Sequence, residues 1–207
     1  MSRQVESYIK KSSPIIGNFI DEKKLNHFKN NDRVNERFKI IFVGSLIHGK
    51  QPLLLIDSIF NLIKDGKDVQ LDILGEGKLL ETAISRVRNL GIADRVNFHG
   101  HVKEPYSFIS SSDILVLPSL SEGVSRSILE ALFLGVPCVL RDVDGSSELI
   151  QEGLNGVLFE KDDDLMDAIL HALKLSRNRT SRSSLLPYNF RQQYAARQYL
   201  DLLESNV

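Results

Sequence analysis

Residues 38–75 read FKIIFVGSLIHGKQPLLLIDSIFNLIKDGKDVQLDILG, and their pattern of apolar side chains indicates the class of fold. Its first apolar run, Lys39–Val43, predicts a buried strand that ends at Gly44. Pro52–Lys64 predicts a helix, because apolar side chains recur at helical spacing and a proline suits the first turn. Val69–Leu74 predicts a second strand. A strand, a helix and a strand in this order are typical of a βαβ unit with parallel strands.

The same alternation continues along the chain. Further strands are expected at Arg95–Phe98, Ile114–Leu117 and Cys138–Leu140, and further helices at Leu79–Leu90, Tyr106–Ser110 and Ser127–Leu134. The predicted strands are apolar throughout, which suits a parallel sheet that is covered on both faces. The sequence therefore predicts an α/β fold, a Rossmann-like parallel sheet with helices on both faces.

This pattern divides the chain into three segments. Residues 1–37 are a polar N-terminal flank, residues 38–176 form the Rossmann-like domain, and residues 177–207 form a basic loop and a C-terminal helix that packs back on the domain. In the flank, the apolar patch Pro14–Ile20 is expected either to add an edge strand or to cross from a neighbouring domain. Tyr188–Glu204 predicts the terminal helix, since its apolar side chains recur at helical spacing.

Composition excludes several classes of protein. The 207 residues include 26 basic and 27 acidic side chains, and this balance gives no reason to expect a nucleic acid partner. The single cysteine, Cys138, excludes an internal disulfide framework and a cysteine-built zinc site. No apolar run approaches the about 20 residues of a membrane span, and Met1–Lys10 lacks the apolar region of a signal peptide. We therefore expect a cytoplasmic protein, at most peripherally bound to the inner face of the membrane.

Gly44–Lys50 has the G-x-x-x-x-G-K spacing of a triphosphate-binding loop. The next residue of such a loop is a serine or threonine that holds magnesium, whereas here it is Gln51. Three interpretations stay open at this point: a P-loop, a plain turn, and a phosphate-binding Lys50 of another kind.

Two other loops argue against common cofactors. Gly75–Gly77 lacks the third glycine of a dinucleotide-binding motif, so no nicotinamide cofactor is expected. Asp142 and Asp144 have the Asp-x-Asp spacing of some metal-dependent sugar transferases, but such spacing is also ordinary in loops. His99 and His101 lack evident third and fourth ligands. No metal site is expected.

The loop and helix that follow the strand Ile114–Leu117 contain two glutamates eight residues apart, Glu122 and Glu130. Between them, Gly123–Ser127 would expose backbone N–H groups at the positive end of a helix, an arrangement that suits a pyrophosphate. The alternative for Glu130 is a capping box, since Ser127 and Glu130 have the Ser-x-x-Glu spacing.

Residues 118–159, PSLSEGVSRSILEALFLGVPCVLRDVDGSSELIQEGLNGVLF, resemble the C-terminal donor-binding domain of the retaining family 4 glycosyltransferases of GT-B fold, the glycosyl transferases group 1. The upstream segments FVGSLIHGK, LDILGEG and VNFHGHV fall where that family has its earlier strand ends. The resemblance covers about residues 14–205, and it implies one half of a GT-B fold.

The resemblance also implies roles for single residues. Lys50 would contact the donor diphosphate, Glu122 would lie by the transferred sugar, and Glu130 would accept hydrogen bonds from the ribose hydroxyls. Lys50 and Glu122 are the implied catalytic residues. The backbone around His101 and Val102 would meet the base. The full donor-binding set is Gly44, Ser45, Lys50, His101, Val102, Glu122, Gly123, Val124, Ser125, Arg126, Ser127 and Glu130.

The chain departs from the family pattern in two ways. The family often has an arginine at Ser45 and a glycine at Gln51, so Lys50 has lost a partner cation that His48 or Arg126 would have to replace. The acceptor-binding N-terminal domain of a GT-B enzyme is also missing, because 207 residues hold one Rossmann-like domain.

We therefore expect the donor-binding domain of a retaining glycosyltransferase that moves a hexose from a nucleoside diphosphate sugar to a hydroxyl acceptor, a glycan or a lipid. The donor would be UDP- or GDP-linked, without a further cofactor, and this half alone would be inactive. The alternatives are a P-loop-like nucleotide hydrolase and a non-catalytic module that binds sugar nucleotides. The sequence does not identify the sugar, the nucleobase or the acceptor.

Overall fold

The computed structural model describes residues 20–29, 37–179 and 182–204, with side chains up to residue 201. Its centre is a six-stranded sheet with the strand order β3-β2-β1-β4-β5-β6, in which every neighbouring pair is parallel. The α/β fold and the parallel sheet predicted from the sequence are confirmed. The strands are β1 (Phe38–Val43), β2 (Val69–Leu74), β3 (Val96–Phe98), β4 (Ile114–Leu117), β5 (Cys138–Arg141) and β6 (Gly156–Phe159).

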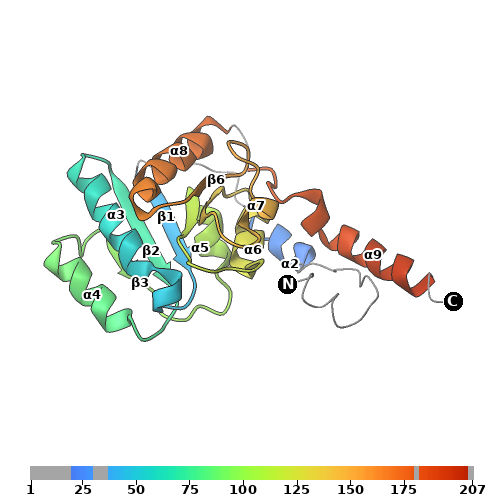
Figure 1. Cartoon of the computed structure of the whole chain (residues 1–207), viewed down its shortest axis with the longest axis horizontal. Coiled ribbons are helices and arrows are strands. Elements are labelled where there is room, and N and C mark those ends of the chain that lie inside the picture. Colours follow the sequence, from blue (N-terminus) through green and yellow to red (C-terminus); the bar gives the residue numbers. More distant parts are fainter. Residues whose placement is uncertain (1–19, 30–36, 180–181, 205–207) are drawn as a thin grey trace.

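Helices surround this sheet (Figure 1). They are α2 (Glu22–Asn26), α3 (Pro52–Lys64), α4 (Leu80–Asn89), α5 (Tyr106–Ser111), α6 (Arg126–Phe133), α7 (Ser146–Leu149), α8 (Leu165–Asn178) and α9 (Gln192–Glu204), with single 3-10 turns η1 (His48–Lys50), η2 (Asp162–Asp164) and η3 (Tyr188–Phe190). α3 packs against α4 and α8, whereas α6 packs against α5 and α2. Since the chain leaves β1 and β4 in opposite directions across the sheet, right-handed crossovers place α3 and α6 on opposite faces.

The core lies on both sides of the two central strands. All four residues of β4 are buried, and so are Ile40, Ile41 and Phe42 of β1. This double burial explains why both strands are apolar throughout. β2 differs, because Gln70 and Asp72 in it are only partly buried.

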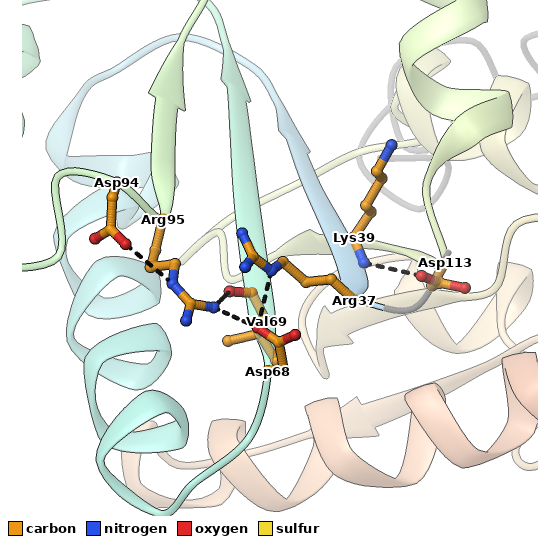
Figure 2. A network of polar contacts seen from close by, with 7 residues as sticks. All are labelled: Arg37, Lys39, Asp68, Val69, Asp94, Arg95 and Asp113. Atoms are coloured by element: carbon orange, nitrogen blue, oxygen red, sulfur yellow. Dashed lines mark hydrogen bonds and ion pairs between the residues drawn. The ribbon is translucent and has the colours of Figure 1, made fainter. Parts of the chain in front are cut away.

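Polar side chains gather at the end of the sheet where the strands begin (Figure 2). Asp68 accepts hydrogen bonds from Arg37 Nε, 2.8 Å away, and from Arg95, while Asp113 accepts one from the backbone N–H of Lys39. The bond from Arg95 is the main cause of a lowered pKa of Asp68. These contacts tie the starts of β1, β2, β3 and β4 together, and they leave the carboxyl ends of the strands for a ligand.

The C-terminal segment differs in detail from the prediction. Tyr188–Glu204 is not one helix, because η3 is followed by Arg191 in an extended conformation with ψ 146°, and α9 begins only at Gln192. Arg191 packs over the Phe133 ring and pairs with Glu22, whereas the rest of α9 runs away from the sheet (Figure 1). The helix α8 extends to Asn178, beyond the expected domain boundary at 176.

The apolar patch Pro14–Ile20, expected either to add an edge strand or to cross from a neighbouring domain, lies outside the described residues, apart from Ile20, which is buried. No helix in the described part of the chain is long and apolar enough to cross a bilayer.

Candidate functional site

The loops that follow β1, β2 and β3 pack directly against one another. Gly75 has φ 147°, and a Cβ atom there would lie 1.9 Å from the carbonyl oxygen of Gly44. Its own N–H donates to Gly100 O at 2.7 Å, and the N–H of Leu46 donates to Glu76 O at 2.8 Å. Only glycine permits this close approach, so the Gly75–Gly77 motif builds the contact between loops.

These loops enclose a cavity of about 300 Å³. It brings together Gly44, Ser45, His101 and Val102, four of the residues predicted for the donor site, and Glu76 closes its wall. Its volume is at the lower end of the range for ligand sites in proteins.

Lys50 lies at the end of η1, beside this cavity's β1 loop, and its ammonium forms an ion pair with the carboxylate of Glu122. Both side chains are partly buried. Ser119 Oγ donates to the same Glu122 oxygen at 3.2 Å, and the N–H of Leu120 donates to Gly49 O at 2.8 Å. The structure therefore joins the two predicted catalytic residues from separate loops.

Asp144 holds the Glu122 loop from the opposite side. Its Oδ2 accepts hydrogen bonds from the N–H of Glu122 at 3.0 Å and from Ser121 Oγ at 2.8 Å. Neither Ser119, in the same loop as Glu122, nor Asp144, in the loop after β5, was predicted to surround Glu122, and nothing local in the sequence marks the contact with Asp144.

The Asp-x-Asp pair does not face a common site. Asp142 lines a separate cavity of about 380 Å³ between β6 and α8, while Asp144 is bonded to the Glu122 loop. Within residues 20–29, 37–179 and 182–204, no group of three histidines, cysteines or carboxylates is placed to hold a metal.

The start of α6 corrects the capping-box alternative. The helix begins at Arg126 with Ser125 as its N-cap, so Ser127 lies inside the first turn. Ser127 Oγ approaches Ser125 Oγ at 3.0 Å and donates to Val43 O at 3.3 Å, instead of capping a helical N–H. The Ser127–Glu130 capping box is therefore wrong, and the bond to Val43 places the positive end of α6 next to the end of β1.

Glu130 is buried in the second turn of α6. Its side chain is 7 % exposed, and Arg126 Nη2, on a largely exposed side chain, lies 3.7 Å from its carboxylate. Burial raises the pKa of Glu130 above its usual value, and the charges of Arg126 and Lys24 oppose this shift. No hydrogen-bond donor of the described residues reaches this carboxylate. A buried carboxylate of this kind favours a ligand that brings its own donors.

The remaining predicted residues form the turn between Glu122 and α6. Gly123 and Arg126 are exposed, Val124 and Ser125 are partly buried, and a Cβ atom at Gly123 would meet nothing within 4 Å. This open space lies in front of the helix start. Arg126 is directed to Glu130, and nothing in the structure shows His48 taking the place of the arginine that the family has at Ser45.

A larger cavity of about 530 Å³ lies elsewhere, between the 151–154 loop, the end of α8 and residues 183–188. Leu154 precedes β6 and Asn178 ends α8, so this cavity lies toward the end of the sheet where the strands begin. It contains none of the predicted site residues.

Comparison with known proteins identifies relatives. Residues 23–185 match the family model described as glycosyl transferases group 1. The chain is 31 % identical over 193 residues to N-acetyl-alpha-D-glucosaminyl L-malate synthase of Bacillus anthracis. These residues cover 88 % of this chain and 51 % of that protein. It is 29 % identical over 139 residues to the UDP-Gal:alpha-D-GlcNAc-diphosphoundecaprenol alpha-1,3-galactosyltransferase of Escherichia coli, covering 66 % of this chain and 35 % of that one. The chain thus spans about half or less of the length of these relatives.

Solved structures share the fold. The lipopolysaccharide outer core galactosyltransferase WaaB, in its apo form, superposes with a TM-score of 0.78 at 21 % identity, over 100 % of this chain and 60 % of that one. Anabaena HepE in complex with UDP and glucose superposes with a TM-score of 0.69 at 20 % identity, over 82 % of this chain and 48 % of that one.

Proposed function

Because the chain belongs to the glycosyl transferases group 1 family, we propose that it is the donor-binding half of a retaining hexosyltransferase. It binds a nucleoside diphosphate sugar, UDP- or GDP-linked, and presents the hexose to a hydroxyl acceptor on a glycan or a lipid. The names of relatives that use UDP-galactose or lipid-linked acceptors, and the neighbour that holds UDP and glucose, support this choice of substrate class.

The observation that carries the proposal is the Glu130 carboxylate, which is buried and lacks a hydrogen-bond donor among the described residues. An ionised carboxylate accepts hydrogen bonds at both oxygens, and the two vicinal hydroxyls of a ribose donate in matching geometry. Burial weakens competition from water, so such bonds add to affinity.

With the ribose at Glu130, the other parts of the donor can be assigned to neighbouring residues. Ser127 ties α6 to the end of β1, so the N-terminal amides of α6 and the ammonium of Lys50 bind the diphosphate. The cavity lined by His101 and Val102 takes the base. Glu122, already beside Lys50, lies by the sugar. Lys50 and the helix end would stabilise the charge on the departing diphosphate, without a metal cofactor.

The acceptor belongs to a second domain in this proposal, since the chain spans about half of its relatives. The chain alone is then expected to bind donors weakly and to transfer no sugar. A cytoplasmic position, with peripheral contact to the membrane where the acceptor is lipid-linked, agrees with the names of relatives that act on diphosphoundecaprenol.

Titration calorimetry with UDP, GDP, ADP, ATP and GTP, each with and without magnesium, tests the proposal. We expect at least one diphosphate to bind equally well in both conditions. The alternative of a P-loop hydrolase requires binding of ATP or GTP only with magnesium. It is disfavoured because Gln51 has φ 52° and turns its amide back to His48 O. Binding of triphosphates alone, or of no nucleotide, would overturn the donor site.

A further inference from the structure

A polar cluster lies on β2 and at the end of β3, outside the contacts described above. Asp72 Oδ1 lies 2.8 Å from His99 Nε2 and accepts a hydrogen bond from Asn97 Nδ2 at 2.9 Å. Asp72 and Asn97 are direct partners across the two strands. Since an ionised aspartate can only accept, His99 Nε2 carries a proton and donates to it.

It is unusual to find such a polar cluster in the middle of a mostly buried strand. Asp72 lies in the middle of a strand whose neighbours Leu71 and Ile73 are buried, and its side chain is itself only slightly exposed. The His99 ring is also partly buried and packs against Phe108 of α5 in a tilted arrangement, with 4.6 Å between centroids and 55° between the ring planes. A carboxylate on a sheet face costs desolvation that its two hydrogen bonds must offset. The orientation of the His99 ring is fixed as a result.

The chain beyond His99 forms the wall of the 300 Å³ cavity. Gly100 turns with φ 66°, and His101 and Val102 then line the cavity. The bond between the His101 N–H and Glu76 Oε1 is long, at 3.3 Å. Backbone bonds hold the start of this wall, from the His99 N–H to Ile73 O at 2.9 Å and from the Gly75 N–H to Gly100 O at 2.7 Å, and the His99 side chain adds its contact to Asp72.

We propose that His99, held by Asp72, is a positioning residue for the donor nucleobase. It sets the place of the backbone at His101 and Val102 and does not itself touch the donor. The inference rests on the proposed function, because that function assigns the cavity to the base. Recognition of a base through backbone groups depends on where those groups lie. If the backbone at His101 and Val102 is held less firmly, UDP should bind more weakly, whereas inorganic pyrophosphate, which has no base, should bind as before.

Two variants separate this role from a general effect on folding. His99→Phe keeps an aromatic ring against Phe108 and removes the donor to Asp72. Asp72→Asn is the matched control, because its amide oxygen still accepts from His99 and Asn97 while the charge is lost. Titrations followed by NMR measure the affinities for UDP and for inorganic pyrophosphate, and thermal unfolding reports the stability of each variant.

We expect His99→Phe to bind UDP about 5- to 10-fold more weakly, because the backbone groups that meet the base are less well positioned, with pyrophosphate binding unchanged within about twofold. Asp72→Asn should stay near the wild type for both. If His99→Phe gives no cooperative unfolding, Asp72→Ala should show the same split.

Unchanged UDP affinity in a folded His99→Phe, or an equal loss for UDP and pyrophosphate, would overturn the positioning role while the proposed function stands. A wild-type chain that binds none of UDP, GDP and ADP would overturn both.

Discussion

Lys50 and Glu122 are 72 residues apart in the sequence, yet the lysine ammonium pairs with the glutamate carboxylate where the first and fourth strands end. This ion pair neutralises the positive charge of Lys50. In the proposed function, a diphosphate would have to replace the Glu122 carboxylate at Lys50, and the replaced carboxylate would then be free to meet the sugar. Since Ser45 supplies no second cation, we expect the balance between these two side chains to govern donor binding.

Replacing Lys50 with alanine should remove most of the affinity for a diphosphate. A charged hydrogen bond to phosphate in a partly desolvated place contributes about 1.5–3 kcal/mol, which corresponds to a roughly 10- to 150-fold loss. Calorimetry with UDP and with uridine separates the effects, because uridine binding should hardly change. Equal losses for both would mean that Lys50 acts through folding.

Glu122→Gln should have the opposite effect on diphosphate binding. The substitution removes a negative charge that competes for Lys50 and keeps a side chain of the same size. We expect UDP to bind about 5- to 20-fold more tightly at low ionic strength, with the gain shrinking as salt is added. Ser119→Ala is the control, since it removes a neutral partner of Glu122 and leaves the ion pair in place. Weaker binding by Glu122→Gln would show that this carboxylate does not compete with the diphosphate.

Glu130→Gln should raise the folding stability of the chain and lower its affinity for UDP. Burial raises the pKa of Glu130, so the folded state holds its proton more tightly than the unfolded state. The wild type therefore loses stability as pH rises from the unfolded pKa, about 4.3, through the raised folded value. Without that charge, the variant should gain about 1 kcal/mol at pH 7, or ~2–4 °C, and show a flatter pH profile.

UDP affinity of the same variant should fall about 10- to 150-fold through loss of charged hydrogen bonds to ribose. Thermal unfolding between pH 4 and 8 and calorimetry measure the two effects. A less stable variant with unchanged affinity would assign Glu130 to the architecture of α6 alone.

Gly75→Ala should disrupt the loops around the 300 Å³ cavity. Its Cβ atom would overlap Gly44 O, and its φ of 147° disfavours any other side chain. We expect a loss of about 3 kcal/mol or more of folding free energy, measured by denaturant unfolding. Gly49→Ala is the matched control in the neighbouring loop, because its Cβ atom would meet nothing within 4 Å. Similar unfolding midpoints for the two variants would contradict the close packing of these loops.

The sequence predicted the fold well wherever burial on both faces leaves a long apolar run. The strand Phe38–Val43 is the clearest example, and the strand Val69–Leu74 and the helix Pro52–Lys64 were predicted although one side of each is less buried. β6 was not predicted, since it starts with a glycine, a residue that is uncommon within strands. Gly156 is required there because a Cβ atom would lie 2.3 Å from Cys138 O, and that contact is long-range.

The site was predicted only in part, for a similar reason. The Ser-x-x-Glu spacing could not show that Ser127 would donate to Val43 O, 84 residues away, instead of capping its own helix. The Lys50–Glu122 pair and the Asp144 contacts also depend on loops that the parallel topology brings together. Local patterns gave the residue types, and the strand order determined their partners.

The most direct test of the donor site is to map UDP on the chain by NMR, from the change in each backbone amide signal during titration. We expect changes at residues 44–51, 99–102 and 122–130, which lie around the carboxyl ends of the strands. In Lys50→Ala, these changes should require higher UDP concentrations than in the wild type. Changes confined to residues 151–154 and 183–188, around the larger cavity, would contradict the proposed donor site.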